Sequence, residues 1–254
     1  MKKINSLEAF NASPHPSFKH TTYFDTYDKI FSPYQNKDIT FVEVGVLNGG
    51  SLFMWRNFFG PKARIIGIDL NPEAKKWEQE GFEIYIGSQS DPSFWKKFLS
   101  EVGPIDVFLD DGGHTYLQQI ITSEFVLDSI SDGGILVVED THTSYLKGFG
   151  NQANSFIHYV HICIEKINSR FSQFKHPQND RRIWSVEIFE SIVAFKINRV
   201  ASELKSAPIW NVEHVKMEKD FRHEDLILIK ENEEEIKTTL QRAFSVNQDV
   251  PVDS

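Results

Sequence analysis

The fold of this chain is decided by the segment Ile105-Asp106-Val107-Phe108-Leu109-Asp110-Asp111-Gly112-Gly113-His114. An apolar run of strand length ends there in two carboxylates, and two glycines then let the chain turn back. The next apolar run, Ile135-Leu136-Val137-Val138, also ends in two carboxylates, Glu139 and Asp140. Continuous runs of Val, Ile, Leu and Phe are typical of parallel strands that are buried on both faces.

The same alternation of apolar runs and helix-length segments extends outward in both directions. We expect strands at 40–46, 64–70, 83–86, 105–109 and 134–138, and helices at 51–59, 72–80, 92–101, 116–130 and 155–171. This order predicts an α/β fold with a Rossmann-like, doubly wound, mostly parallel sheet. Two further runs, 183–189 and 191–197, are separated by Glu190 alone, which predicts a pair of antiparallel strands at the sheet edge.

Length and composition limit the classes of protein that remain. The 254 residues, with 40% hydrophobic and 25% charged residues, fit one large α/β domain or two small ones. We expect an N-terminal helical lid segment at 1–39, one catalytic domain at 40–198, and a charged extension and tail at 199–254. The net charge of −9 weighs against a nucleic-acid partner, since phosphate binding requires concentrated Lys and Arg.

Other features of the sequence indicate where in the cell the protein is expected to be found. No run approaches the roughly 18 apolar residues of a membrane helix, and no apolar stretch follows Lys2 and Lys3 as it would in a signal peptide. A single cysteine, Cys163, cannot form an internal disulfide or a thiolate metal cluster. We therefore expect a cytoplasmic protein that does not bind membranes.

The first strand-to-helix turn, Glu43-Val44-Gly45-Val46-Leu47-Asn48-Gly49-Gly50-Ser51, predicts a ligand site. Its glycines let a ligand approach the backbone, and the N–H groups at the start of the helix point at that ligand. The spacing is not G-x-G-x-x-G, so a dinucleotide is not the first choice. Asp69 closes the second strand about 20 residues later, where an acid can accept both hydroxyls of a ribose. In the alternative interpretation, the glycines form only a turn and Asp69 caps the next helix.

This E-x-G-x-x-x-G-G pattern, together with the acid that ends the following strand, resembles the cofactor site of class I S-adenosylmethionine-dependent methyltransferases. The resemblance implies S-adenosylmethionine as cofactor. The residues that it assigns to cofactor binding are Glu43, Gly45, Gly49, Ser51 and Asp69. Gln89, in Ser88-Gln89-Ser90-Asp91, falls where that fold holds the adenine. The alternative for this last segment is a cluster of helix-capping residues before Pro92.

Four carboxylates are expected to meet at one edge of the sheet. If the fourth and fifth strands are neighbours, Asp110, Asp111, Glu139 and Asp140 converge there, with His114 beside them. Such a cluster of like charges favours a bound divalent cation, and oxygen ligands favour Mg²⁺ or Mn²⁺ over zinc. In the alternative interpretation one or two of these residues cap helices and the others are solvated.

The segments Asp110-Asp111-Gly112-Gly113-His114 and Glu139-Asp140-Thr141-His142-Thr143-Ser144-Tyr145 resemble the paired motifs of the macrocin and mycinamicin type of sugar O-methyltransferases. Gly113 stands where that family usually has serine. The weaker part of the match runs from about Tyr23 to Val193.

The resemblance implies a role for each residue of the two motifs. The metal ligands would be Asp111, Glu139 and Asp140, with His114 as general base, Asp111 as a second catalytic residue, and Asp110 facing the cofactor. The choice of Asp111 over Asp110 as metal ligand depends on the resemblance alone. His142 and Tyr145 would contact the substrate; for His142 a purely local hydrogen-bonding role is the alternative. Tyr23 and Tyr27, four residues apart, would cover the cofactor or pack in the core.

The predicted activity is methyl transfer from S-adenosylmethionine to a sugar hydroxyl. A divalent metal would chelate two neighbouring hydroxyls of the acceptor, and His114 would accept the proton. Abundant Lys, Asn, Ile and Phe, typical of an AT-rich bacterial genome, favour a nucleotide-activated sugar or a sugar of a cell-surface capsule polysaccharide. The resemblance also implies a homo-oligomer. The alternatives are a catechol-type or other small-molecule O-methyltransferase, an NAD-dependent dehydrogenase, and a cofactor-binding regulatory protein without enzymatic activity.

Overall fold

The computed structural model describes residues 3–171, 174, 180–211, 221 and 226–245. The chain divides into two compact units, Met1–Ser206 and Ala207–Ser254. Within the described residues, no helix combines the length and apolar composition needed to cross a membrane. Lys175, His176, His214 and His223 lie outside the described residues.

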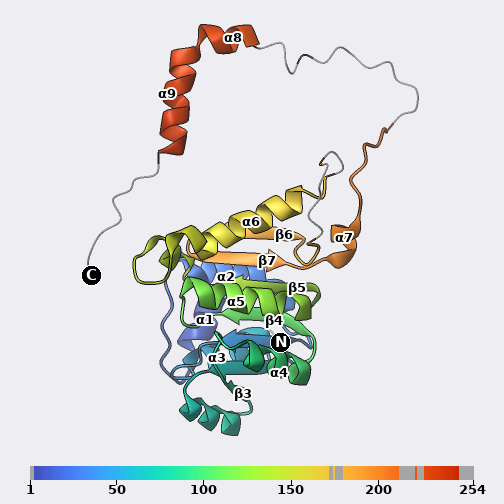
Figure 1. Ribbon diagram of the computed structural model, residues 1–254. Helices are drawn as coiled ribbons and strands as arrows, with labels where there is room; N and C mark the ends of the chain where they lie inside the picture. Colours follow the sequence, from blue (N-terminus) through green and yellow to red (C-terminus); the bar gives the residue numbers. More distant parts are fainter. Residues whose placement is uncertain (1–2, 172–173, 175–179, 212–220, 222–225, 246–254) are drawn as a thin grey trace. The chain divides into compact units, whose positions relative to one another are not determined.

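A seven-stranded sheet forms the centre of the first unit (Figure 1). Its strands are β1 Thr40–Val44, β2 Arg64–Asp69, β3 Glu83–Ile86, β4 Ile105–Asp110, β5 Ile130–Val138, β6 Ser185–Phe189 and β7 Ile192–Lys196. The spatial order is β3-β2-β1-β4-β5-β7-β6. The first five strands are parallel, and β7 runs antiparallel to both of its neighbours, β5 and β6. The predicted doubly wound sheet with an antiparallel edge is confirmed.

Helices cover both faces of this sheet (Figure 1). The helices of the first unit are α1 Ser6–Asn11, α2 Tyr23–Phe31, α3 Gly50–Phe59, α4 Pro92–Val102, α5 Tyr116–Val126, α6 Phe156–Asn168 and α7 Arg199–Glu203. One core packs α1, α2 and α3 against the sheet through aromatic side chains such as Tyr27 and Trp55. The second core packs α4, α5 and α6 against the opposite face through Trp95 and Phe156. Burial of this apolar surface is the main stabilising contribution to the fold.

Short 3₁₀ helices occupy several connections. They are η1 Ser32–Tyr34, η2 Pro72–Glu80, η3 Leu127–Ser129, η4 Thr141–Tyr145 and η5 Gln152–Asn154. The predicted helix at 72–80 is a 3₁₀ helix, and its buried residues are Ala74 and Trp77. The predicted helix at 116–130 ends at Val126 instead, since Ile130 already pairs with Ile105 as the start of β5.

The N-terminal residues pack as part of the first unit. The backbone N–H of Ser6 donates to Asp28 Oδ1 at 2.7 Å, and the Ser6 hydroxyl donates to the carbonyl of Phe24 at 2.9 Å. These bonds join α1 to α2. Farther along, the Ser13 hydroxyl donates to the carbonyl of Gly50 at 2.8 Å, which fixes the following segment on the start of α3. The lid role expected for residues 1–39 remains a prediction.

The first unit extends beyond residue 198, the last residue of the expected catalytic domain. The backbone N–H of Arg199 donates to Asp132 Oδ1 at 2.6 Å, and its guanidinium donates to the carbonyl of Asp128 at 3.1 Å. In the second unit, the described residues form α8 Leu226–Glu231 and α9 Glu233–Phe244. The acidic residues at 233–235 occupy the first turn of α9, and their side chains are exposed.

Candidate active site

A cavity of about 420 Å³ opens at the carboxyl ends of β1, β2, β4 and β5. Its wall combines the N-terminal segment 16–20 with the glycine turn after β1, the end of β2, the turn after β3 and the residues that follow β4 and β5. Ligands of doubly wound sheets bind at this edge, where loops from neighbouring strands converge. The cavity therefore brings together most of the segments that the sequence analysis selected.

The glycine turn after β1 has a backbone that requires glycine at Gly45 and Gly49. Gly45 has φ +93°, and a Cβ there would collide with the backbone carbonyl of Asp111. Gly49 has φ +79°, and a Cβ there would collide with the ring of Trp77. Side chains rarely adopt such φ values, and neither position has room for one. The turn consequently lies against the segment after β4. Gly45 lines the cavity, whereas Gly49 is not part of the described cavity wall.

Asp69 holds this turn and also lines the cavity. Its Oδ2 accepts hydrogen bonds from the backbone N–H groups of Val46 and Leu47, both at 2.9 Å, and its Oδ1 accepts one from Asn71 at 2.8 Å. The side chain that caps the next helix is Asn71, which accepts from the N–H of Glu73 at 3.0 Å. Asp69 therefore lines the cavity at the end of β2, where a ribose-binding acid was expected, and it does not itself cap the helix.

Glu43 lies beneath the cavity rather than in its wall. The carboxylate is fully buried and accepts hydrogen bonds from the Ser51 hydroxyl at 2.7 Å and the Trp55 indole at 3.0 Å. Burial raises the pKa of Glu43 to about 7. Ser51 itself lines the cavity, so Glu43 would act on a cofactor through Ser51 and the turn that it supports.

Gln89 connects the turn after β3 to the residues after β4. Its amide nitrogen lies 3.0 Å from Asp110 Oδ1 and 3.0 Å from Thr122 Oγ1, and its carbonyl oxygen accepts from the N–H of Gly113 at 2.7 Å. Gln89 lines the cavity, whereas Asp110 is buried behind it, and burial raises the pKa of Asp110. Asp110 thus positions Gln89 and the turn at 112–113, and Asp111 is the acid of this pair that faces the cavity.

The ends of β4 and β5 lie side by side, as the sequence predicted. Asp110 pairs with Val138 in the register of these strands, so Asp111 and Glu139 follow at the same edge. Ligand atoms of Asp111, His114 and Asp140 all lie within 4.8 Å of one another, and His114 Nε2 lies 3.3 Å from Asp140 Oδ2. This group of two carboxylates and an imidazole has the composition of a small divalent-cation site.

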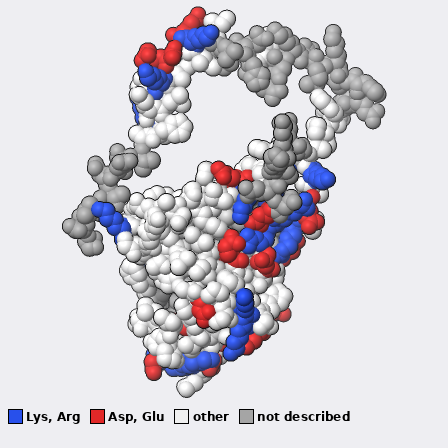
Figure 2. All heavy atoms as spheres, viewed as in Figure 1, with Lys and Arg blue, Asp and Glu red and all other residues white. Residues whose placement is uncertain are grey.

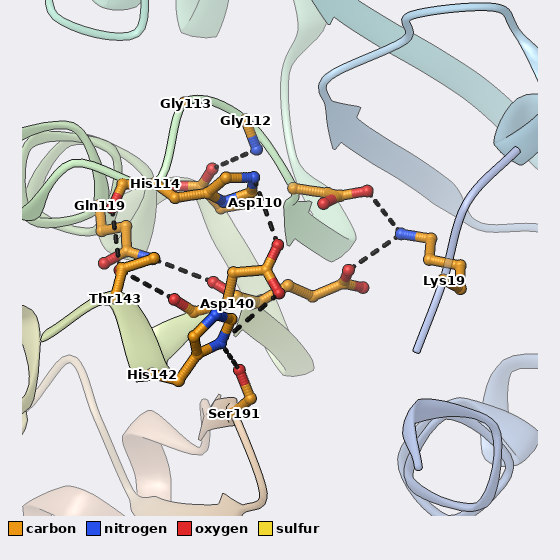
Figure 3. A network of polar contacts seen from close by, with 12 residues as sticks. Lys19, Asp110, Gly112, Gly113, His114, Gln119, Asp140, His142, Thr143 and Ser191 are labelled. Carbon is orange, nitrogen blue, oxygen red and sulfur yellow. Dashed lines mark hydrogen bonds and ion pairs between the residues drawn. The ribbon is translucent and has the colours of Figure 1, made fainter. Parts of the chain in front are cut away.

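Lys19 enters the carboxylate cluster from the N-terminal segment (Figure 3). Its ammonium nitrogen lies 2.5 Å from Asp111 Oδ2, 2.9 Å from Glu139 Oε2 and 3.9 Å from Glu43 Oε1. Burial alone would lower the pKa of Lys19, but the three carboxylates outweigh burial and raise it above its ordinary value. The lysine is therefore charged. The sequence analysis missed it, because Lys19 precedes Asp111 by 92 positions and no motif surrounds it.

Two tyrosines of α2 complete the carboxylate contacts. The Tyr27 hydroxyl donates to Glu139 Oε1 at 2.5 Å, and the Tyr23 hydroxyl lies 2.5 Å from Asp140 Oδ1. Burial and the adjacent carboxylates raise the pKa of both phenols, so they remain protonated donors. Burial likewise raises the pKa of Glu139 well above its ordinary value. Both interpretations of these tyrosines have support, because Tyr27 packs in the core while Tyr23 lines the cavity.

The turn of the β6–β7 hairpin reaches the same site through Ser191 (Figure 3). Its hydroxyl lies 2.9 Å from the Tyr23 hydroxyl and 2.5 Å from His142 Nδ1. His142 Nδ1 is also 3.9 Å from Asp140 Oδ1, and the His142 side chain is half-exposed beside the cavity. Tyr145 is 55% exposed and is not part of the described cavity wall. Substrate contact by His142 and Tyr145 stays a prediction, and Ser191 was not anticipated from the sequence.

Part of this chain is similar in sequence to known methyltransferases. Residues 42–141 match a family model described as a methyltransferase domain. A mycinamicin VI 2''-O-methyltransferase from Micromonospora griseorubida is 33% identical over 147 residues, which cover 55% of this chain and 36% of that protein. An 8-demethyl-8-alpha-L-rhamnosyl tetracenomycin-C 2'-O-methyltransferase from Streptomyces olivaceus is 31% identical over 135 residues, which cover 50% of this chain and 35% of that protein.

A solved structure shares the fold of this chain. It is the MycE methyltransferase of the mycinamycin biosynthetic pathway in complex with Mg, SAH and mycinamycin VI, with a TM-score of 0.72 at 24% identity. The similarity covers 90% of this chain and 60% of that chain. The matched region spans about a third of the length of the curated relatives. The fold is therefore that of class I methyltransferases, as the sequence predicted.

Proposed function

We propose that this chain, which contains a methyltransferase domain at residues 42–141, transfers a methyl group from S-adenosylmethionine to a hydroxyl of a sugar. The observation that carries the proposal is the convergence of Asp111, His114 and Asp140 on one cavity that is also lined by the glycine turn and Asp69. The sugar O-methyltransferases among its relatives support the acceptor class.

The cavity fits S-adenosylmethionine, which supplies a methyl group already activated on a sulfonium. The backbone at Gly45 lines the cavity and would face the methionine part, and Gly50 and Ser51 at the start of α3 line the cavity as well. Asp69 would accept the ribose hydroxyls, and Gln89 would contact the adenine. Ser51 lines the cavity, and Glu43 supports Ser51 from beneath.

The carboxylate cluster fits a divalent cation. The oxygens of Asp111, Glu139 and Asp140 are hard ligands that suit Mg²⁺ or Mn²⁺. The contacts of the Lys19 ammonium with Asp111 and Glu139 support a site for positive charge here. The bound ion would lower the pKa of an acceptor hydroxyl. Asp111, Glu139 and Asp140 would hold it, with Tyr23 and Tyr27 orienting the acidic side chains.

His114 would accept the proton of the acceptor hydroxyl. Its ring lines the cavity, and Nε2 faces Asp140 Oδ2 at 3.3 Å, which would stabilise the imidazolium that forms. The Thr143 hydroxyl lies 3.0 Å from the carbonyl oxygen of His114 and 2.9 Å from that of Asp140, so both backbones are fixed relative to each other. Because the base and the cofactor would lie in one cavity, the acceptor oxygen would be aligned with the methyl group, and this alignment would further accelerate methyl transfer.

A more specific part of the proposal is the kind of molecule to which the acceptor sugar belongs. By their names, the curated relatives modify antibiotic glycosides, so they support a glycoside and not a capsule polysaccharide in particular. The capsule sugar and the nucleotide-activated sugar remain predictions from composition alone. His142 and Ser191, beside the cavity, are the residues that we expect nearest to the acceptor.

The decisive experiment is a screen of acceptors. Purified protein, S-adenosylmethionine and Mg²⁺ would be incubated with nucleotide sugars, glycosides, capsule fragments and catechol, and products would be detected by mass spectrometry. We expect a mass gain of one methyl group on at least one sugar, abolished by EDTA and restored by Mg²⁺. Methylation of catechol but of no sugar would contradict the acceptor class, and full activity in EDTA would contradict the role of the metal.

A further inference from the structure

Lys19 occupies the interior of the carboxylate cluster rather than its rim. Its side chain is 2% exposed, and its ammonium contacts Asp111 Oδ2 and Glu139 Oε2 within hydrogen-bond distance. These two oxygens belong to residues that the proposed function assigns to the divalent cation. A single lysine therefore holds oxygens that the cation would also need.

We propose that Lys19 and the divalent cation compete for Asp111 and Glu139, so that Lys19 sets the affinity of this site for metal. The proposal rests on the metal site of the proposed function. An ammonium and a divalent cation that both contact these oxygens would repel each other strongly in a poorly solvated cluster. Binding of the ion therefore requires the ammonium to move away from Asp111 and Glu139.

The N-terminal segment is built so that the side chain of Lys19 can move while its backbone stays in place. Before Lys19, the Ser13 hydroxyl donates a hydrogen bond to the carbonyl of Gly50, and the ring centroids of His15 and Trp77 are 4.5 Å apart. After Lys19, the ring centroids of His20 and of Tyr23, at the start of α2, are 5.1 Å apart. Lys19 itself lines the cavity, which offers its flexible side chain space beside the cluster.

The carboxylates have other partners that keep them in place when the ammonium moves. Glu139 Oε1 accepts a hydrogen bond from Tyr27, and Asp140 Oδ1 contacts the Tyr23 hydroxyl. Both tyrosines belong to α2, which packs in the first core. A substitution of Lys19 should consequently leave the cluster assembled and the protein folded, which makes the competition measurable.

The test is the dissociation constant of Mn²⁺, measured by electron paramagnetic resonance without cofactor or acceptor. We compare wild type with Lys19→Met, which removes the charge and keeps the length, and with Lys62→Met, which removes one charge from an exposed site. We expect Lys19→Met to bind Mn²⁺ at least tenfold more tightly than wild type and Lys62→Met to bind within twofold. Equal or weaker binding by Lys19→Met would overturn the competition.

A second measurement uses the wild-type chain alone. An amine-acylating reagent is applied with and without Mg²⁺, and modification of Lys19 is followed by mass spectrometry of peptides, with Lys62 as internal reference. We expect Lys19 to react several-fold faster in Mg²⁺, because the displaced ammonium loses its carboxylate partners; an unchanged rate would overturn the proposal.

The two measurements separate this proposal from the proposed function. If wild type methylates a sugar and binds Mn²⁺ while Lys19→Met binds no more tightly, the competition fails and the function stands. If none of the proteins binds Mn²⁺, the competition is refuted together with the metal part of the proposed function.

Discussion

Two site residues, His114 and Asp140, have backbone conformations that side chains usually avoid. Their φ values are +57° and +54°. A third such residue, Ser191, with φ +60°, contacts the Tyr23 hydroxyl and His142. Conformations of this kind cost about 1 kcal/mol or more each and persist where surrounding contacts fix them. The φ of His114 turns the chain back over the edge of the sheet. This turn was expected from the two glycines, Gly112 and Gly113, that precede His114.

His114→Ala should lower kcat by at least about 100-fold, the usual contribution of a general base. Binding of S-adenosylmethionine should be nearly unchanged, because the glycine turn and Asp69 are untouched. Steady-state kinetics and calorimetry measure the two quantities. The matched control is His161→Ala. His161 is an exposed residue of α6 that lies 3.3 Å from Glu165 and is not part of the described cavity wall. A kcat within twofold of wild type would rule out His114 as the base.

Gly45→Ala tests the glycine turn. The substitution combines a strained φ with a collision against the backbone of Asp111, so we expect a loss of about 2–4 kcal/mol in unfolding free energy and much weaker cofactor binding. Gly81→Ala is the control, because Gly81 has φ +80° with no atom near its missing Cβ. It should cost only about 1 kcal/mol and leave cofactor binding intact. Urea denaturation would show equal losses if the collision did not matter.

At the scale of elements, the site depends on contacts between segments far apart in sequence. Helix α2 supplies Tyr23 and Tyr27 to acids at the end of β5, and the β6–β7 hairpin supplies Ser191. Another such contact joins α5 to the residues before β6: Arg182 lies 2.8 Å from Asp180 and 2.9 Å from Glu124 of α5. In Figure 2, acidic and basic side chains lie next to one another along one edge of the visible face. These ion pairs fasten the hairpin edge to the helical layer.

The Arg182 contacts predict how stability depends on pH. Hydrogen bonds from Arg182 lower the pKa of Asp180 below its ordinary value. Because the folded pKa is depressed, the carboxylate contributes stability above the unfolded pKa of about 3.9, and this contribution is lost as pH falls below that value. Asp180→Asn should therefore destabilise the protein at pH 7, and the difference from wild type should shrink near pH 3. Glu101→Gln, in an exposed pair with Lys97, is the control. A difference independent of pH would contradict the ion-pair account.

At the scale of the whole molecule, the described cavity wall belongs entirely to the first unit. Its residues lie between Pro16 and Asp140, and the hairpin that supports them ends at Lys196. The compact unit closes at Ser206. The site and both apolar cores are therefore contained in residues 1–206.

A chain that ends at Ser206 should fold and retain cofactor binding. We expect its thermal midpoint to lie within about 3 °C of the full chain, since removal of a unit with separate contacts changes little of the free energy of the first. Differential scanning calorimetry and S-adenosylmethionine titration of both proteins measure this. A midpoint lowered by about 10 °C or more would show that residues 207–254 stabilise the first unit.

The sequence by itself determined the sheet and the acids at its edge. Apolar runs and glycine positions are local signals, so strands such as β3 were predicted residue for residue and the adjacency of β4 and β5 followed from the fold class. Strand ends fix where Asp111, Glu139 and Asp140 lie, because parallel strands place their carboxyl ends at one edge.

Only the tertiary structure decided which side chains surround those acids. Lys19 and Tyr27 contact these acids, and Ser191 contacts the Tyr23 hydroxyl beside them. These residues come from three segments that no sequence spacing relates to the acids. It also separated Asp110, buried behind Gln89, from Asp111, which faces the cavity. The physical reason is that local patterns specify backbone conformation and burial, whereas charge pairing is a long-range choice among many lysines and hydroxyls that only the packed chain resolves.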